Sequence, residues 1–191
     1  MLDSRQAFLV LVLAVAAERL VELGLSLRNA RRARARGGLE LESRAFYALM
    51  VGSHAAFLAA APLEVELAGR RFVPALGWPM LVLVAGAMAL RYWAVAALGE
   101  RWNTRVIVVP GEPAVSGGPY RFVRHPNYVA VIVEIFALPL VHSAWVTALV
   151  FSAGNAALLA ARIRREEAAL ARHSDYAARL GDRGRFLPGG R

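Results

Sequence analysis

The sequence predicts an all-α integral membrane protein with about five transmembrane helices, and three observations support this prediction. The 191 residues are 58% hydrophobic and have a positive mean hydropathy, whereas soluble chains usually contain about 45–50% apolar residues. Several apolar runs approach the roughly 20 residues that an α-helix needs to cross a bilayer. Arginine is concentrated between these runs rather than within them, which is typical of membrane proteins.

We expect one membrane domain over residues 1–191, because no internal repeat or low-complexity linker interrupts the chain. The expected helices cover residues 7–27, 45–63, 72–98, 128–141 and 144–180. The fourth is short for a full crossing, and only His142 and Ser143 separate it from the next apolar run, which predicts a tight hairpin. The polar end of 144–180 is expected to be a cytoplasmic C-terminal helix. The first run lacks a basic flank and a cleavage-like site, so we expect a retained helix.

The distribution of charge along the chain predicts an orientation in the membrane and argues against nucleic-acid binding, and the composition argues against a metal site. The net charge is +9, and all 23 basic residues are arginine. They are most frequent at 28–36, at 101–124 and after 161, so the positive-inside rule places the N-terminus outside and the C-terminus in the cytoplasm. Because these arginines flank apolar runs, we expect a lipid bilayer as the partner and no nucleic acid. The chain has no cysteine, and no spacing of histidines or carboxylates indicates a metal site.

The stretch GGPYRFVRHPNY, residues 117–128, is unusual in such an apolar chain. Its glycines and Pro119 predict a sharp turn. Pro126 suits the first turn of the helix that follows, which His125 or Asn127 could cap. One interpretation is an interfacial loop that binds lipid headgroups. The other is a rigid anion-binding corner, in which backbone N–H groups of residues 120–124 are the donors.

The last apolar run also carries polar residues at helical spacing. Asn155, Arg162 and Glu166 are seven and four residues apart, so they share one face of a helix. This polar stripe would suit a site where an amphiphilic substrate meets a polar cofactor. The alternative is an ordinary surface pair of Arg162 and Glu166, worth about 0.2–0.5 kcal/mol.

Two segments together resemble the isoprenylcysteine carboxyl methyltransferase family. Gly118-Pro119-Tyr120 and Arg124-His125-Pro126-x-Tyr128 resemble its first motif, and residues 162–170, RIRREEAAL, resemble the segment after its last membrane helix. The resemblance covers roughly residues 85–190. It implies S-adenosylmethionine as the cofactor and a cytoplasmic active site, with a cofactor-binding region at about 100–128 and 155–188.

The N-terminal part resembles a bacterial branch of this family, through Glu18-Arg19-x-x-Glu22-Leu23 and Arg101-Trp102-Asn103-Thr104. That branch is associated with O-methylation of long-chain phenolic lipids, whereas eukaryotic members methylate the carboxylate of prenylated cysteines. The resemblance therefore implies a bacterial-type cytoplasmic membrane and a lipophilic or prenylated acceptor, with the choice between the two left open.

The resemblance and the chemistry of the cofactor together give a set of candidate residues. The cofactor-binding candidates are Gly118, Tyr120, Arg121, His125, Pro126, Tyr128, Asn155, Arg162, Glu166 and Glu167. The substrate-binding candidates are Trp102, Asn103, Glu22 and Glu134. Arg124 would bind a carboxylate acceptor. A phenol would need a base, for which Glu18, Glu22, His54 and Glu134 are the candidates. Alternatively, Glu18, Arg19, Glu22 and Arg91 pair with one another across the bundle.

Two other functions stay open on the sequence. Sterol reductases are distant relatives that use NADPH, but their chains are about twice as long. A non-enzymatic membrane protein that only binds anionic lipid would also explain the arginine-rich loops.

Overall fold

The computed structural model describes residues 3–189, and it is almost entirely helical, as predicted. The long helices are α1 (Ser4–Ala35), α2 (Arg44–Leu67), α3 (Pro74–Leu98), α4 (Pro126–Leu140) and α5 (Trp145–His173), followed by the short α6 (Tyr176–Leu180). Two 3-10 turns, η1 (Gly99–Arg101) and η2 (Gly118–Arg121), interrupt the chain between α3 and α4. Two-residue strands β1 (Leu39–Glu40) and β2 (Ile107–Val108) pair antiparallel, with Leu39 opposite Val108.

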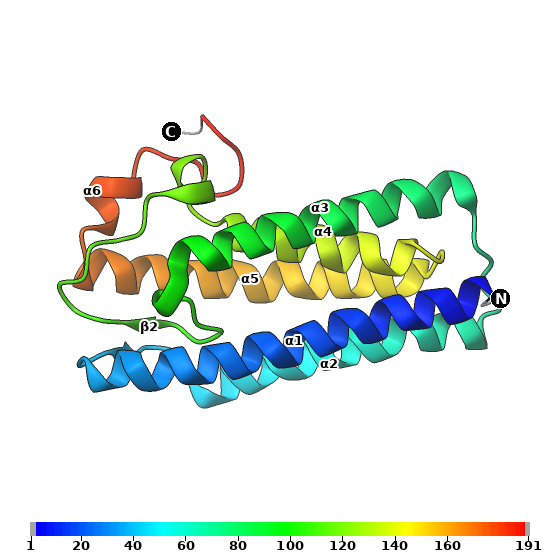
Figure 1. The fold of residues 1–191 in the computed structure, drawn as a ribbon, viewed down its shortest axis with the longest axis horizontal. Coiled ribbons are helices and arrows are strands. Elements are labelled where there is room, and N and C mark those ends of the chain that lie inside the picture. Colours follow the sequence, from blue (N-terminus) through cyan, green and yellow to red (C-terminus); the bar gives the residue numbers. More distant parts are fainter. Residues whose placement is uncertain (1–2, 190–191) are drawn as a thin grey trace.

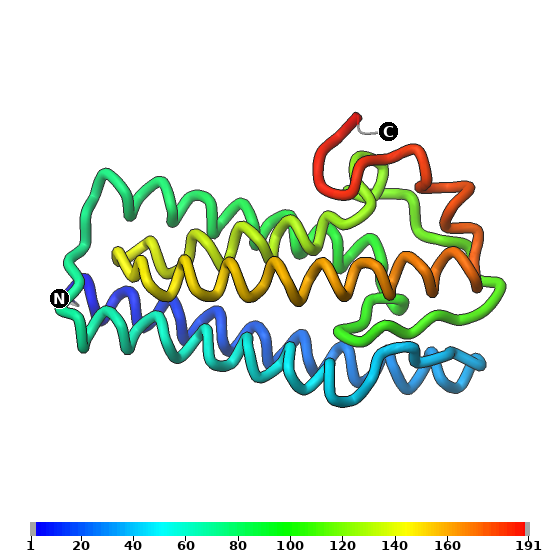
Figure 2. The backbone as a smooth tube through the Cα atoms, turned by 180° about the vertical axis from the view of Figure 1, so that it is seen from behind, coloured from blue at the N-terminus to red at the C-terminus, as the bar shows by residue number. Residues whose placement is uncertain are grey.

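The five long helices run along one axis, with α1 and α2 in one layer and α3, α4 and α5 in the other (Figure 1). Within the second layer, α4 packs against both α3 and α5, and α2 joins the layers through its contacts with α5. The turns η1 and η2, helix α6 and the C-terminal segment gather at the end of the bundle opposite the N-terminus (Figure 2). This end therefore carries both segments that the sequence singles out.

Local sequence signals explain where most helices begin. Asp3 and Gln6 form a capping box at the start of α1, with 2.8 Å from the Gln6 amide to Asp3 Oδ1. Ser43 caps α2, and Pro126 occupies the first turn of α4. His125 precedes α4, but its side chain makes no capping hydrogen bond. At the start of α5, the amides of Val146 and Thr147 donate to the Glu64 carboxylate of α2, and the distance from the Thr147 amide is 2.7 Å.

Within residues 3–189, three helices are long and apolar enough to cross a membrane, namely α2, the Pro74–Arg101 segment that contains α3, and α5. Helix α4 is apolar but only 15 residues long, as the sequence predicts. Five crossings, and the orientation of the termini, stay predictions.

Two expected boundaries are wrong. Helix α1 does not end near residue 27 but continues to Ala35, because alanine and arginine, which dominate residues 28–36, are strong helix formers. The expected helix 144–180 breaks after His173, where Ser174 is extended. The Ser174 hydroxyl donates to the Leu170 carbonyl at 2.7 Å and accepts from the Tyr176 amide at 3.3 Å, which competes with helix continuation.

The apolar core lies in the half of the bundle near the N-terminus. Its buried side chains come from α1, α2, α3, α4 and the start of α5, and they include Phe8, Phe57, Val84 and Leu138. The other half of the bundle has a smaller apolar cluster, formed by Val106, Val108 and Ala169, and it contains a cavity.

Candidate functional site

A cavity of about 630 Å³ lies between the two layers of helices in the half of the bundle near η1 and η2. All five long helices contribute to its wall, together with residues 101–109 and 112–115 and with Tyr176. The cavity is therefore lined by the two segments that the sequence singles out and also by α1 and α2.

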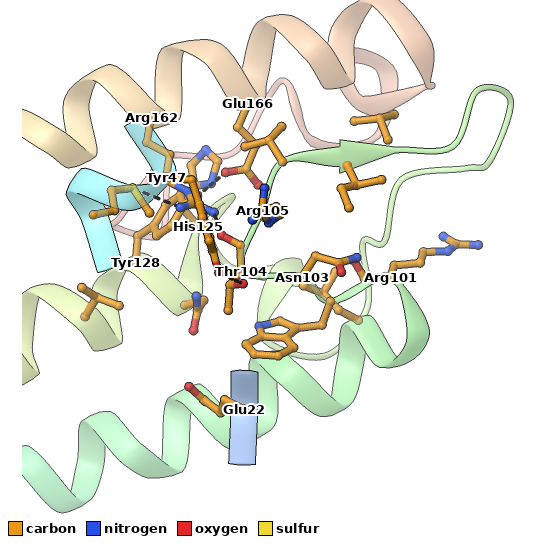
Figure 3. A pocket seen from close by; sticks show the side chains of 18 of the residues that line it. Glu22, Tyr47, Arg101, Asn103, Thr104, Arg105, His125, Tyr128, Arg162 and Glu166 are labelled. Carbon is orange, nitrogen blue, oxygen red and sulfur yellow. Dashed lines mark hydrogen bonds between the residues drawn. The ribbon is translucent and has the colours of Figure 1, made fainter. Parts of the chain in front are cut away.

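The hydroxyl of Tyr128 is the centre of a polar network at one end of the cavity (Figure 3). It donates a short hydrogen bond to Glu166 Oε2 and accepts one from Arg162 Nε at 2.8 Å. Arg162 also donates to the Thr104 carbonyl at 2.5 Å. The ring of His125 stacks on Tyr128, with 5.2 Å between the ring centroids. One tyrosine thus joins α4 to Arg162 and Glu166, two of the predicted polar residues of α5.

The predicted stripe on α5 lines this cavity. Asn155 and Arg162 are buried, Glu166 is half-buried, and all three belong to the cavity wall. Within residues 3–189 no ion pair joins Arg162 directly to Glu166. The alternative of a surface i,i+4 pair is therefore wrong, because the Tyr128 hydroxyl lies between the two side chains.

Glu167 faces a different set of partners from its neighbour Glu166. Its carboxylate contacts Arg124 Nη1 at 3.3 Å, His125 Nε2 at 3.1 Å and Arg185 Nη2 at 2.6 Å. It is not part of the cavity wall. Its contacts instead hold the motif after η2 against the C-terminal segment.

The backbone of the motif is not the free anion-binding corner considered above. The amide of Arg124 donates to the Gly184 carbonyl at 2.9 Å, and that of His125 donates to the Arg185 carbonyl at 3.1 Å. The amides of Tyr120 and Phe122 are used inside the η2 turn. The amides of Arg124 and His125 are occupied because the C-terminal segment pairs with the motif. This contact joins residues about 60 positions apart.

Three predicted cofactor-binding residues also lie away from the cavity wall. Gly118 has φ of 57°, and a Cβ there would lie 2.8 Å from that of Ala97, so glycine lets η2 pack closely on α3. Pro126 is fully buried at the start of α4. Arg121 is exposed and lies over the Phe122 ring. Tyr120, His125 and Tyr128 are the motif residues of that set that do line the cavity.

The segment after η1 supplies another part of the wall. Trp102 is buried, and Asn29 of α1 donates to its carbonyl at 2.9 Å. The Thr104 hydroxyl lies 2.8 Å from that of Ser26 and 3.0 Å from that of Tyr47. Trp102 and Asn103, the predicted substrate-binding residues, line the cavity, and their role in binding stays a prediction. Tyr47 also lines the cavity, and Ser26 supports Thr104 from α1. The sequence gives no sign of these two, because single polar residues in α1 and α2 form no motif.

A cluster of ion pairs borders the deep end of the cavity. Arg91 of α3 makes two hydrogen bonds of 2.6 Å to Glu22 of α1. Arg19 lies 2.6 Å from Glu22, 3.0 Å from Glu134 of α4 and 3.2 Å from Glu18. The cross-bundle pairing that the sequence left open is thus present, and Glu134 belongs to it. Neither Glu18 nor Glu134 lines the cavity.

His54 lines the cavity with a defined arrangement of its ring nitrogens. Its Nδ1 lies 2.9 Å from the Met50 carbonyl. A carbonyl oxygen can only accept, so Nδ1 carries the hydrogen and the neutral ring has its acceptor at Nε2. Among the predicted bases, His54 is therefore the one with an available acceptor in the wall of the cavity.

Several polar atoms around the cavity are buried and have no hydrogen-bond partner within the described residues. They are Asn103 Oδ1, Arg124 Nε, Asn127 Oδ1 and the Tyr176 hydroxyl, and each belongs to a residue of the wall. Burial raises the pKa of Tyr120 and of Tyr176, so both hydroxyls keep their protons at neutral pH. Unpartnered buried polar groups are costly. The wall therefore offers both donors and acceptors to a polar ligand.

Nothing in the described part of the chain resembles a metal centre, because no group of three histidines, carboxylates or cysteines gathers there.

The chain does match a known family: residues 80–172 match the isoprenylcysteine carboxyl methyltransferase family. The "Uncharacterized protein YpbQ" of Bacillus subtilis (strain 168) is 34% identical over 168 residues, which cover 87% of this chain and 98% of that protein.

The chain belongs to the isoprenylcysteine carboxyl methyltransferase family. An uncharacterized protein of Haemophilus influenzae is also similar, at 29% identity over 82% of this chain and 90% of that protein. The family segment runs from within α3 to the end of α5, so it contains the η2 motif, Tyr128, Arg162 and Glu166. The polar network of the cavity thus lies in the segment shared with a family of membrane methyltransferases.

Proposed function

We propose that this protein is an S-adenosylmethionine-dependent methyltransferase that methylates an oxygen of a lipophilic acceptor. One observation carries the proposal: a single cavity joins the polar network of the family segment to an apolar wall formed by α1 and α2. The polar end suits a cofactor that carries an amino acid and a nucleoside. The apolar wall suits the hydrocarbon part of a membrane-soluble acceptor.

The residues of the polar end fit the proposed cofactor. Glu166 accepts hydrogen bonds and suits the ribose hydroxyls or the ammonium group. Asn127, Arg124 and Tyr176 have unpartnered polar atoms that suit the other polar groups. Tyr120 offers an aromatic ring at the same end. Gly118 and Pro126 shape this end indirectly. Gly118 lets η2 pack against α3, and Pro126 begins α4.

The bound cofactor would supply an already activated methyl group, so the work of the protein is to hold the acceptor oxygen in line with it. The side chains of Ala16, Leu23, Ala55 and Leu58 line the cavity beside Glu22, Arg91 and His54. The long apolar tail of the acceptor would lie along these four apolar side chains, and its polar head would contact the three polar ones.

The acceptor end favours a hydroxyl acceptor such as a phenolic lipid. A phenol, with an ordinary pKa near 10, must lose its proton during the transfer. His54 Nε2 would accept that proton, since Nδ1 already donates to the Met50 carbonyl. Glu18 is a weaker candidate, because it contacts Arg19 and lies outside the wall.

A carboxylate acceptor, as on a prenylated cysteine, is the second candidate. The observation in its favour is Arg124, which lines the cavity and whose Nε is buried without a partner. Its Nη1, however, already contacts Glu167. We therefore place the phenolic acceptor first.

The proposed reaction takes place at the cytoplasmic side of the membrane, with the N-terminus on the other side. The arginines after α1, around η1 and after α5 support this orientation. The cavity would then receive the cofactor from the cytoplasm and the acceptor from the bilayer.

Two measurements test the proposal. Titration of S-adenosylhomocysteine into the detergent-purified protein by calorimetry should give saturable binding, and no binding to a folded sample would overturn the cofactor assignment. Membranes incubated with methyl-labelled cofactor should then methylate an alkylresorcinol more than a farnesylated cysteine. The reverse preference would favour the Arg124-bound carboxylate, and labelling of neither would support a protein that only binds lipid.

His125→Ala and Glu166→Ala should each abolish methylation and leave membrane insertion intact. His125 stacks on Tyr128 and contacts Glu167, and Glu166 accepts from Tyr128, so both changes disrupt the polar end. Arg121→Ala is the matched control, since Arg121 belongs to the same motif but is exposed outside the cavity wall. Full activity of both alanine variants would contradict the site.

A further inference from the structure

Glu42, in the connection between α1 and α2, is a buried carboxylate without a hydrogen bond. Its side chain is only 1% exposed, and neither carboxylate oxygen has a hydrogen-bond partner within residues 3–189. The nearest cation is Arg162, whose Nη1 lies 3.6 Å from Glu42 Oε1. Leaving a carboxylate desolvated and without hydrogen bonds is unfavourable for folding. Glu42 therefore acts on its surroundings through its charge, as the counter-ion of the buried Arg162.

Arg162 gives its hydrogen bonds to other groups. Its Nη2 donates to the Thr104 carbonyl, its Nε to the Tyr128 hydroxyl, and its Nη1 lies 3.1 Å from the Met50 sulfur. Glu42 thus interacts with Arg162 through charge and not through a formed hydrogen bond. Since Arg162 lines the cavity and Glu42 does not, the carboxylate lies behind the guanidinium.

Arg162 is the one cation that interacts, directly or through the Tyr128 hydroxyl, with two buried or half-buried carboxylates among the described residues at this end. Glu42 and Glu166 lie on two sides of the one guanidinium of Arg162. The neighbouring carboxylates each have two arginine partners, Glu40 with Arg34 and Arg105 and Glu167 with Arg124 and Arg185, so each of those groups has a net charge of +1. With both glutamates ionised, the group around Arg162 has a net charge of −1.

We propose that Glu42 supplies a negative charge beside Arg162 at the polar end of the cavity, and that this charge makes the site bind the cationic methyl donor in preference to the neutral demethylated product. The inference rests on the proposed function. S-adenosylmethionine carries a sulfonium, an ammonium and a carboxylate, so its net charge is +1. In the transfer, the methyl group moves to the acceptor oxygen, the electron pair of the broken carbon–sulfur bond stays on sulfur, and the acceptor releases its proton. The product is neutral, so its attraction to Glu42 is smaller and its release is favoured.

The burial of Glu42 affects both the range of its charge and its pKa. A charge in a poorly solvated region acts over a longer distance than a charge at the surface. Burial also raises the pKa of Glu42, and Glu166 adds to this effect, whereas Arg162 and Arg105 oppose it. Glu42 therefore loses its charge at a higher pH than an exposed glutamate.

The test compares donor and product binding in Glu42→Gln, which removes the charge and keeps the size of the side chain. Calorimetry with S-adenosylmethionine should show an affinity about tenfold lower than in the natural protein, a loss typical of one partly screened charge. The affinity for S-adenosylhomocysteine should change by less than about threefold. Glu42→Asp, which keeps the charge, should retain the preference for the donor.

Glu40→Gln is the matched control, since Glu40 lies two residues away and its ion pairs are with Arg34 and Arg105. It should leave the ratio of the two affinities unchanged. An equal loss of both affinities in Glu42→Gln would overturn the proposal, because Glu42 would then only position Arg162. An unchanged ratio would overturn it as well. If the natural protein binds neither compound, it is the proposed function that fails.

A pH series gives a second readout. In the natural protein, the preference for the donor should fall as the pH is lowered and Glu42 becomes protonated. The part of this change that is due to Glu42 should be absent in Glu42→Gln, while any contribution of Glu166 remains in both. Identical pH profiles of the two proteins would contradict the assignment.

Discussion

Two buried charge clusters border one cavity within residues 3–189, and they differ in how completely their groups are paired. In the deep cluster, Arg91 binds both oxygens of Glu22, and Arg19 contacts Glu22, Glu18 and Glu134. In the cluster at the polar end, one tyrosine hydroxyl connects Arg162 to Glu166, and Glu42 has no hydrogen bond at all.

This difference separates a structural role from a binding role. The deep cluster connects α1, α3 and α4, and both oxygens of Glu22 are hydrogen-bonded there, while Glu18 Oε1 and Arg19 Nε have no partner within residues 3–189. The cluster at the polar end is surrounded by unpartnered atoms of Asn127, Arg124 and Tyr176. Removing one member of a buried ion pair strongly destabilises the fold, whereas unpartnered polar groups are available to a ligand. The first cluster should therefore control stability, and the second should control affinity.

The largest effect is expected for Arg91→Leu. Removing this cation leaves Glu22 buried with Arg19 as its remaining partner, and breaking a buried pair typically costs about 3–5 kcal/mol. The thermal unfolding temperature in detergent should fall sharply, or the folded fraction should be lost. Adding Glu22→Gln to Arg91→Leu should restore part of the stability, because the orphaned charge is then removed. Arg71→Leu, at an exposed position, is the control, and an equally small effect at Arg91 would contradict the structural role.

Tyr128→Phe should instead lower affinity and cost less stability than Arg91→Leu. It removes one hydrogen bond to a carboxylate and one from a guanidinium, and hydrogen bonds to charged groups are worth about 1.5–3 kcal/mol. The affinity for S-adenosylhomocysteine, measured by calorimetry, should fall by about ten- to a hundredfold. Tyr92→Phe, at an exposed position outside the cavity wall, should bind normally. If Tyr128→Phe unfolds the protein, the two clusters do not differ as argued.

Patterns within short segments of the sequence predict much of this arrangement. The apolar runs predict the helices, and the spacing of Asn155, Arg162 and Glu166 predicts one face of α5 that lines the cavity. The motif before α4 likewise predicts a rigid turn next to the site, which η2 and Pro126 provide. In each case the deciding interactions lie within a few residues of one another, where helical spacing and proline geometry apply.

The remaining features depend on contacts between distant parts of the chain. The amides of Arg124 and His125 are occupied because residues 184 and 185 pair with them, which no local pattern indicates. Tyr47 and Glu42 join the site only because the start of α2 packs beside α5 and the Thr104 segment. Glu134 looks isolated in the sequence because its partners are on α1 and α3. Pairing across helices needs the fold.

The smallest effect is expected for Asp175→Asn, at an exposed position on the rim of the cavity. Asp175 accepts a 2.6 Å hydrogen bond from the Ala114 amide and contacts Arg179 at 2.5 Å. These interactions hold the pKa of Asp175 below its ordinary value. A lowered pKa means that the charged form stabilises the fold above the ordinary value of 3.8, and that this contribution is lost as the pH falls through the lowered pKa.

Unfolding temperatures of the natural protein and Asp175→Asn should therefore differ slightly at about pH 7 and converge in acid. A difference that grows as the pH falls would contradict this sign. Because Ala114 and Tyr176 both line the cavity, the same change should also loosen the connection between α6 and residues 112–115. It should weaken S-adenosylhomocysteine binding less than Tyr128→Phe does, since it alters the rim and leaves the hydrogen bonds of the polar end in place.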